Sequence, residues 1–150
     1  MPPPIHEFRV NDTPVTVNRY GTRAYRIWRQ LVYRMSIAAA PSGVPIVNPC
    51  MVKVRYFHHQ DLKKDVDNIL KPILDGLQGL AGGRRVLPRI LDDDHLVAQV
   101  VSRRTDLVFG TKVRANAFRR EEFLAMMDAL AGDAAVYVRV DSPPDDRTRI

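Results

Sequence analysis

The chain has 150 residues, enough for one domain with a buried core; 45% of them are hydrophobic and 27% are charged. These proportions exclude a largely disordered chain, and no apolar run approaches the roughly 18 residues of a membrane span. The formal net charge is +6, which favours a polyanionic partner only weakly. The single cysteine, Cys50, excludes an internal disulfide, and no secretion signal pattern opens the chain, so we expect a cytoplasmic protein.

The first elements in chain order are a strand and a helix. Residues 5–10 have the composition of a short strand and are followed by a turn at 11–14. Helical spacing runs from 22 to about 39, with Thr22 as a plausible N-cap. The buried face predicted for this helix comprises Ala24, Trp28, Leu31, Val32 and Met35.

Further strands and helices follow. Strands are expected over 44–59, 96–103, about 107–115 and 134–140, with helices from about 65 onward and near 120–130. This mixture predicts one α+β domain, with a mixed or antiparallel sheet and two to three packed helices. Residues 1–4 and about 141–150, rich in proline and charge, are expected to be loose tails.

Basic residues dominate the first part of the chain. No acidic residue lies between Asp12 and Asp61, while seven basic residues do: Arg19, Arg23, Arg26, Arg29, Arg34, Lys53 and Arg55. Arg23, Arg26 and Arg34 would share the outer face of the predicted helix. That face fits phosphate contacts and fits an ordinary solvated surface equally well.

Carboxylates gather in the middle of the chain. Val66, Ile69, Leu70, Ile73, Leu74 and Leu77 recur at helical spacing, so Asp67, Lys71 and Asp75 should share the opposite face. Asp65 joins them if the chain enters the helix extended. Pro72 implies that this helix starts late or is kinked.

Carboxylates brought this close would repel one another unless they are protonated or bound to cations. Such hard oxygen ligands suit Mg²⁺, and a neighbouring lysine can offset phosphate charge. Each acidic cluster taken alone is explained as well by helix caps or a solvated turn.

These residues bring the chain to a known family. Asp65, Asp67, Asn68, Lys71, Asp75 and Leu77 form the string D-x-D-N-x-x-K-x-x-x-D-x-L, and Asp93, Asp94 and Val97 form D-D-x-x-V downstream. This two-part motif resembles that of the RusA-type Holliday junction resolvases. The stretch TPVTVNRYGTRAYRIWR resembles the family's N-terminal loop and first helix, so the resemblance spans roughly residues 5–104.

The resemblance implies a homodimeric endonuclease that uses Mg²⁺, with Mn²⁺ as an alternative, to cut opposing strands of branched DNA such as a four-way junction. It implies Asp65, Asp67 and Asp94 as metal ligands, with Asp93 as the alternative if the register slides. Lys71 matches the catalytic lysine, and Asn68 and Asp75 match supporting positions. The expected DNA contacts are Arg19, Arg23, Arg26, Arg34, Lys63 and Lys64. Residues after about 105 look like an addition to the shorter family pattern.

Two other functions remain open at this point. One is a non-catalytic module that binds branched DNA, in which the acidic cluster is structural. The other treats Asp65 and Asp67 as the Asp-x-Asp site of a nucleotide or nucleotide-sugar transferase. Neither a P-loop nor a nucleophile-elbow motif is present. His95, beside Asp94, is a further candidate for proton transfer.

Overall fold

The computed structural model describes residues 4–39, 45–59, 66–81, 84–86, 88–107 and 114–143. Its strands and helices follow one another in chain order as β1 (His6–Val10), α1 (Arg23–Ala38), β2 (Cys50–His58), α2 (Leu70–Leu77), β3 (Leu80–Ala81), β4 (Arg84–Arg85), β5 (Val97–Asp106), α3 (Arg120–Ala131) and β6 (Ala134–Asp141). Four short 3₁₀ helices lie between them: η1 (Val17–Arg19), η2 (Val66–Ile69), η3 (Asp94–Leu96) and η4 (Ala115–Ala117).

The main sheet has four strands in the order β1-β6-β2-β5. β6 pairs antiparallel with both β1 and β2, whereas β2 and β5 are parallel. This mixed sheet with three α-helices confirms the α+β prediction. The last strand therefore lies between the first two, so the region after 105 completes the sheet and is no appendage.

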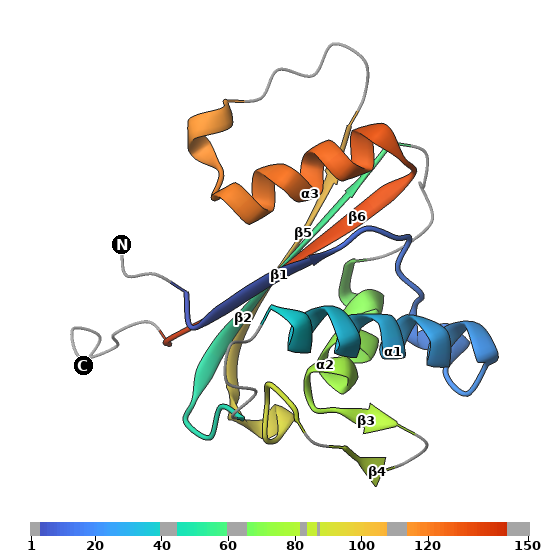
Figure 1. Ribbon diagram of the computed structural model, residues 1–150, viewed down its shortest axis with the longest axis vertical. Coiled ribbons are helices and arrows are strands. Elements are labelled where there is room, and N and C mark those ends of the chain that lie inside the picture. The colour runs from blue at the N-terminus through green and yellow to red at the C-terminus, as the bar shows by residue number, and fades with distance from the viewer. Residues whose placement is uncertain are drawn as a thin grey trace.

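The helices cover the two faces of the sheet unequally. α1 and α2 lie on one face and α3 on the other (Figure 1). Alternate β2 side chains serve the two layers: Val52, Val54 and Tyr56 are buried on the side of α1 and α2, and Phe57 is buried under α3. The period of two in this strand builds both cores from one element.

α1 largely follows its predicted pattern. Thr22 caps it as predicted, with its side chain accepting a hydrogen bond from the Tyr25 backbone N–H, and Trp28 is buried. Met35 was predicted on the buried face and is instead 37% exposed, while Tyr25 and Ser36 are buried. The buried stripe is therefore rotated toward α2, which packs against this helix.

Three strand predictions need correction. The strand predicted over 44–59 is shorter, because only Cys50–His58 is strand and Ile46 makes an isolated bridge to Leu91. The strand predicted near 107–115 falls mostly on residues 108–113, which lie outside the described residues; at its ends, Leu107 lies outside any strand and Ala115–Ala117 is a 3₁₀ helix. The C-terminal tail starts later than predicted, because Asp141 belongs to β6 and is buried.

The helices in the described part of the chain are all too short or too polar to cross a membrane.

Candidate functional site

The helix of the acidic motif begins late, as Pro72 predicted. η2 holds Asp67 and Asn68, and α2 starts only at Leu70. Pro72 therefore stands in the first turn of α2, where a missing N–H is tolerated. Asn68 is half-buried. Asp65, Lys63 and Lys64 lie outside the described residues, as does the side chain of Asp67.

Asp75 does not lie on an exposed face with Lys71, which corrects the prediction from spacing. Asp75 is 2% exposed, and its Oδ2 accepts a hydrogen bond of 2.9 Å from the hydroxyl of Tyr25 on α1. Lys71 is half exposed, and its Nζ donates to Oδ1 of Asp75 across 3.3 Å. The reason is that α1 covers the side of α2 that spacing alone leaves open to solvent.

The environment of Tyr25 keeps its hydroxyl protonated. Burial raises the pKa of Tyr25, and the hydrogen bond to the Asp75 carboxylate raises it further. The phenol is therefore a dependable donor at neutral pH. A buried carboxylate without such a donor would be costly, so this contact fixes α2 against α1.

The two downstream aspartates have different surroundings. Asp93 is the N-cap of η3: its carboxylate accepts a hydrogen bond from the His95 backbone N–H and lies 2.9 Å from His95 Nδ1. Asp94 is exposed, and its carboxylate makes no hydrogen bond or ion pair with any described residue. It stands just before β5, whose first residue is Val97.

The first half of the motif contacts both the N-terminal loop and the strand that follows the second half. η2 contacts both η1 and β5, and α2 also contacts η1. η1 and η2, from separate parts of the sequence, thus lie together, and η2 also lies beside the strand β5. Side chains that the structure describes include no group of three His, Cys, Asp or Glu residues placed to hold a metal ion. Of the three predicted ligands, only Asp94 has a described side chain.

The predicted DNA-contacting arginines are exposed. Arg23, Arg26 and Arg34 lie on the outer face of α1, and Arg19 is exposed in η1. None of the four forms an ion pair within the described part of the chain. Arg26 only donates to the Gly21 carbonyl, at 3.0 Å. This leaves four positive charges free for a polyanion.

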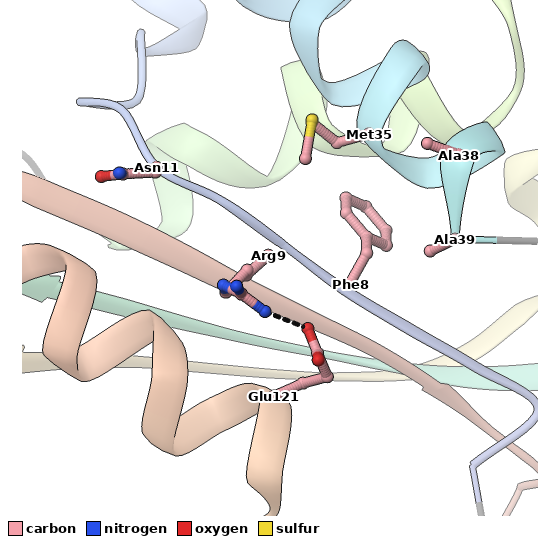
Figure 2. A pocket seen from close by; sticks show the side chains of 7 residues that line it. All are labelled: Phe8, Arg9, Asn11, Met35, Ala38, Ala39 and Glu121. Carbon is pink, nitrogen blue, oxygen red and sulfur yellow. Dashed lines mark hydrogen bonds and ion pairs between the residues drawn. The ribbon is translucent and has the colours of Figure 1, made fainter.

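A separate hollow of about 320 Å³ lies where β1 passes between the end of α1 and the start of α3 (Figure 2). Phe8 and Met35 form its apolar wall, and an ion pair of 2.7 Å between Arg9 and Glu121 crosses one side. No residue of the acidic motif lines it. The charges at this hollow satisfy each other, so it offers no chemistry to the site.

No known family model matches this chain, and no curated protein matches it. The resemblance to the RusA-type resolvases therefore rests on the motif residues themselves.

Tyr25 was missed by sequence reasoning. It lies 50 residues from Asp75, and no local spacing signals their contact. Lys53 and Arg55 alternate with apolar residues in the predicted strand, but they were not predicted to bind a partner. The structure places them on one sheet face with Arg103 and Arg139.

Proposed function

We propose that this protein is a Mg²⁺-dependent endonuclease that cuts branched DNA, with a four-way junction as substrate. The observation that carries the proposal is the exposed carboxylate of Asp94 in front of β5, the strand that η2 contacts; this carboxylate has no partner among the described residues. η2 contains Asp67 and leads directly into the helix that carries Lys71. Both halves of the acidic motif are thus attached to neighbouring elements.

The surroundings of the two aspartates support Asp94 over Asp93 as the ligand. A metal ligand needs oxygen atoms that are not already hydrogen-bonded, and the Asp93 carboxylate already caps η3. Asp65, Asp67 and Asp94 would hold the ion, with Mn²⁺ able to replace Mg²⁺. A bound Mg²⁺ would supply a Lewis acid for the scissile phosphate and lower the pKa of a bound water.

Lys71 would offset the negative charge that develops on the phosphate. Its ammonium group is held near α2 by Asp75, which is itself fixed by Tyr25. Asp75 and Asn68 therefore act as positioning residues in this proposal. Cleavage of two opposing strands requires two such centres, which we assign to a homodimer.

The arginines of η1 and α1 would contact the DNA backbone, joined by Lys63 and Lys64. Recognition would then follow shape and phosphate position more than base sequence, and affinity would fall steeply with salt. A single buried cysteine, Cys50, fits a reducing compartment, and we place the protein in the cytoplasm.

The test is cleavage of a labelled four-way junction beside a linear duplex of equal length, with Mg²⁺, with Mn²⁺ and with EDTA. Three chains are compared: the native chain, Asp94→Asn and Asp93→Asn. Asparagine caps helices as well as aspartate does, so Asp93→Asn is a matched control that keeps η3. We expect metal-dependent paired cuts near the crossover, a loss on the order of a hundredfold in Asp94→Asn, and nearly native rates in Asp93→Asn.

The opposite ranking of the two variants would make Asp93 the ligand. Equal rates in all three chains would exclude the acidic turn from the site. Binding of the junction without cutting, in either metal and by the native chain, would replace the nuclease proposal with that of a binding module.

A further inference from the structure

A second basic surface lies on the sheet face that carries α3, opposite the face that α2 covers. α3 packs on β6, β1 and β2, and a hollow of about 220 Å³ remains over the middle of β2, β5 and β6. Four cations line it, together with Glu122 and Tyr137: Lys53, Arg55, Arg103 and Arg139. We call this the β-face groove.

The register of the sheet sets these cations against one another. Lys53 stands directly opposite Arg139 across β2 and β6, and Arg55 stands directly opposite Arg103 across β2 and β5. In an antiparallel pair such as β2 and β6, opposed residues on one face have Cβ atoms only about 4.5–5.5 Å apart, and like charges there are destabilising. This pair of cations, with the second pair beside it, is explained if an anion occupies the groove.

The carboxylates nearby neutralise only half of this charge. Glu122 pairs with Arg55 at 3.1 Å, and Asp141 pairs with Arg139 at 2.8 Å. Glu7, which accepts from the Tyr137 hydroxyl, is already matched by Arg119 at 2.9 Å. Lys53 and Arg103 form no ion pair with any described residue. Within the described part of the chain, the groove therefore has two positive charges without a paired carboxylate.

Part of the groove is rigid. The Arg55 guanidinium lies over the rings of Phe57 and Phe118, with centroids at 4.9 and 4.7 Å. Its Nε also donates to Thr105 Oγ1 at 3.0 Å. A cation held between two rings and a carboxylate loses little freedom when an anion binds. The groove is thus preorganised on one side and open at the exposed Arg103 on the other.

We propose that the β-face groove binds phosphate groups of a nucleic-acid backbone, as a second contact surface on the opposite face of the sheet from Lys71. At about 220 Å³ the hollow is smaller than the roughly 300–1,000 Å³ of small-molecule sites, so it fits one phosphate of a longer strand better than a whole nucleotide. Val101 and Arg103 of β5, the edge strand of the sheet, line it, so a nucleic-acid strand can continue past that edge. The inference does not depend on cleavage.

The test measures binding of labelled DNA by fluorescence anisotropy in EDTA, with the full chain, over a series of salt concentrations. The variant Lys53→Gln/Arg103→Gln removes the two uncompensated charges and no ion pair. The matched control, Arg114→Gln/Arg120→Gln, removes two exposed charges that do not line the groove. We expect affinity to fall roughly tenfold in the groove variant, with a salt slope lower by about one to two, and to fall less than about threefold in the control.

Equal losses in the two variants would overturn the proposal, because the effect would then be one of net charge. Free phosphate ions have the same chemistry as the phosphates of a DNA backbone. A titration with inorganic phosphate, followed by the NMR shifts of backbone amides in the groove, distinguishes these two ligands. Saturable phosphate binding that is lost in the groove variant, with unchanged DNA affinity, would make this a site for the free anion and would also overturn the backbone assignment.

One further readout, the Tm, keeps the result interpretable. Removing like charges that face each other should leave the Tm of the groove variant at or above the native value. A clear fall in Tm would show that Lys53 or Arg103 supports the fold, and would count against the proposal. Cleavage plays no part in any of these measurements, so failure of the nuclease proposal and failure of this one are distinguishable.

Discussion

The hydrogen bond from Tyr25 to Asp75 joins two helices through one buried carboxylate. The two described partners of the Asp75 carboxylate are the Tyr25 hydroxyl at 2.9 Å and the Lys71 ammonium at 3.3 Å. Lys71 is half exposed to solvent, so the Tyr25 phenol is the buried one of the two partners. The position of Lys71 in the proposed site therefore depends on a residue that touches no substrate.

Tyr25→Phe is expected to destabilise the protein by about 1.5–3 kcal/mol at pH 8, since a hydrogen bond to a buried charged group is lost. Above about pH 10 this cost should shrink. The pKa of Tyr25 is raised in the folded state, so the unfolded chain releases the phenol proton first and rising pH favours unfolding. At pH 11 the cost should be smaller by about 1.4 kcal/mol, measured by urea unfolding.

Tyr137→Phe provides the comparison. The pKa of Tyr137 is also raised, first by burial and then by its hydrogen bond to Glu7, so the alkaline trend should recur there. Lys71 should be displaced in Tyr25→Phe alone, with a lower rate of any junction cleavage. A Tyr25→Phe cost that is the same at pH 8 and pH 11 would contradict the linkage.

For single residues, the sequence predicted which side chains are exposed better than it predicted which side chains contact each other. The arginines of α1 are exposed as expected, because a polar stripe opposite an apolar one points to solvent. The spacing also placed Lys71 beside Asp75, and they do contact. It could not place Tyr25, because the burial of Asp75 depends on how a second helix packs, which no local pattern records.

At the scale of elements, α1 and α2 approach each other closely because Gly76 has no side chain. A Cβ at this position would lie 2.7 Å from Val32 Cγ1 and 3.1 Å from the Arg29 carbonyl oxygen. Real Cβ atoms do not approach that near, so any larger residue must separate the helices. The closeness also brings Tyr25 within reach of Asp75.

Gly76→Ala should therefore destabilise the fold, although alanine favours helix by about 0.5–1 kcal/mol. Overpacking costs about 1–3 kcal/mol, and we expect a net loss near 1 kcal/mol. Val32→Ala relieves the tightest contact, so Gly76→Ala should cost less in that background by about 0.5 kcal/mol or more. A double-mutant cycle in urea measures this coupling; strictly additive costs would place the strain elsewhere.

The elements with a strong period were predicted well, and those with mixed signals were not. β1, α1, α3 and β6 lie within a few residues of their predicted ranges, because each has a clear apolar period. The strand predicted near 107–115 lies mostly outside the described residues, and only its ends can be compared. Leu107 is buried but does not lie in a strand. An apolar side chain can be buried in a core whatever the backbone conformation of its residue.

At the scale of the whole molecule, sheet order was beyond the sequence. The α+β class followed from the mixture of elements, but the pairing of β6 with β1 and β2 depends on contacts between distant parts of the chain. The motif comparison suggested that the region after 105 is an addition to the family pattern. The sheet order shows instead that β6, which belongs to this region, lies in the interior of the sheet. The length of the family motif does not show which strand lies in the middle of the sheet.

A chain ending after Asp106 should fail to fold. β1 would lose β6, the strand it pairs with, and β2 would lose one of its two neighbours. We expect poor amide dispersion in NMR spectra and no cooperative thermal transition. A chain ending after Pro143 is the control, because it retains every described element and should unfold like the full chain. A folded product from the shorter chain would show that β6 is dispensable.

The pairing of β1 with β6 also has a consequence during synthesis. Glu7 and Tyr137 are 130 residues apart, and the strand pair forms only after both have left the ribosome. At about 5–20 residues per second, β1 waits on the order of ten seconds with Phe8 and Val10 uncovered. The nascent chain therefore presents an uncovered apolar strand at the tunnel exit for that time, which is the kind of surface that chaperones protect.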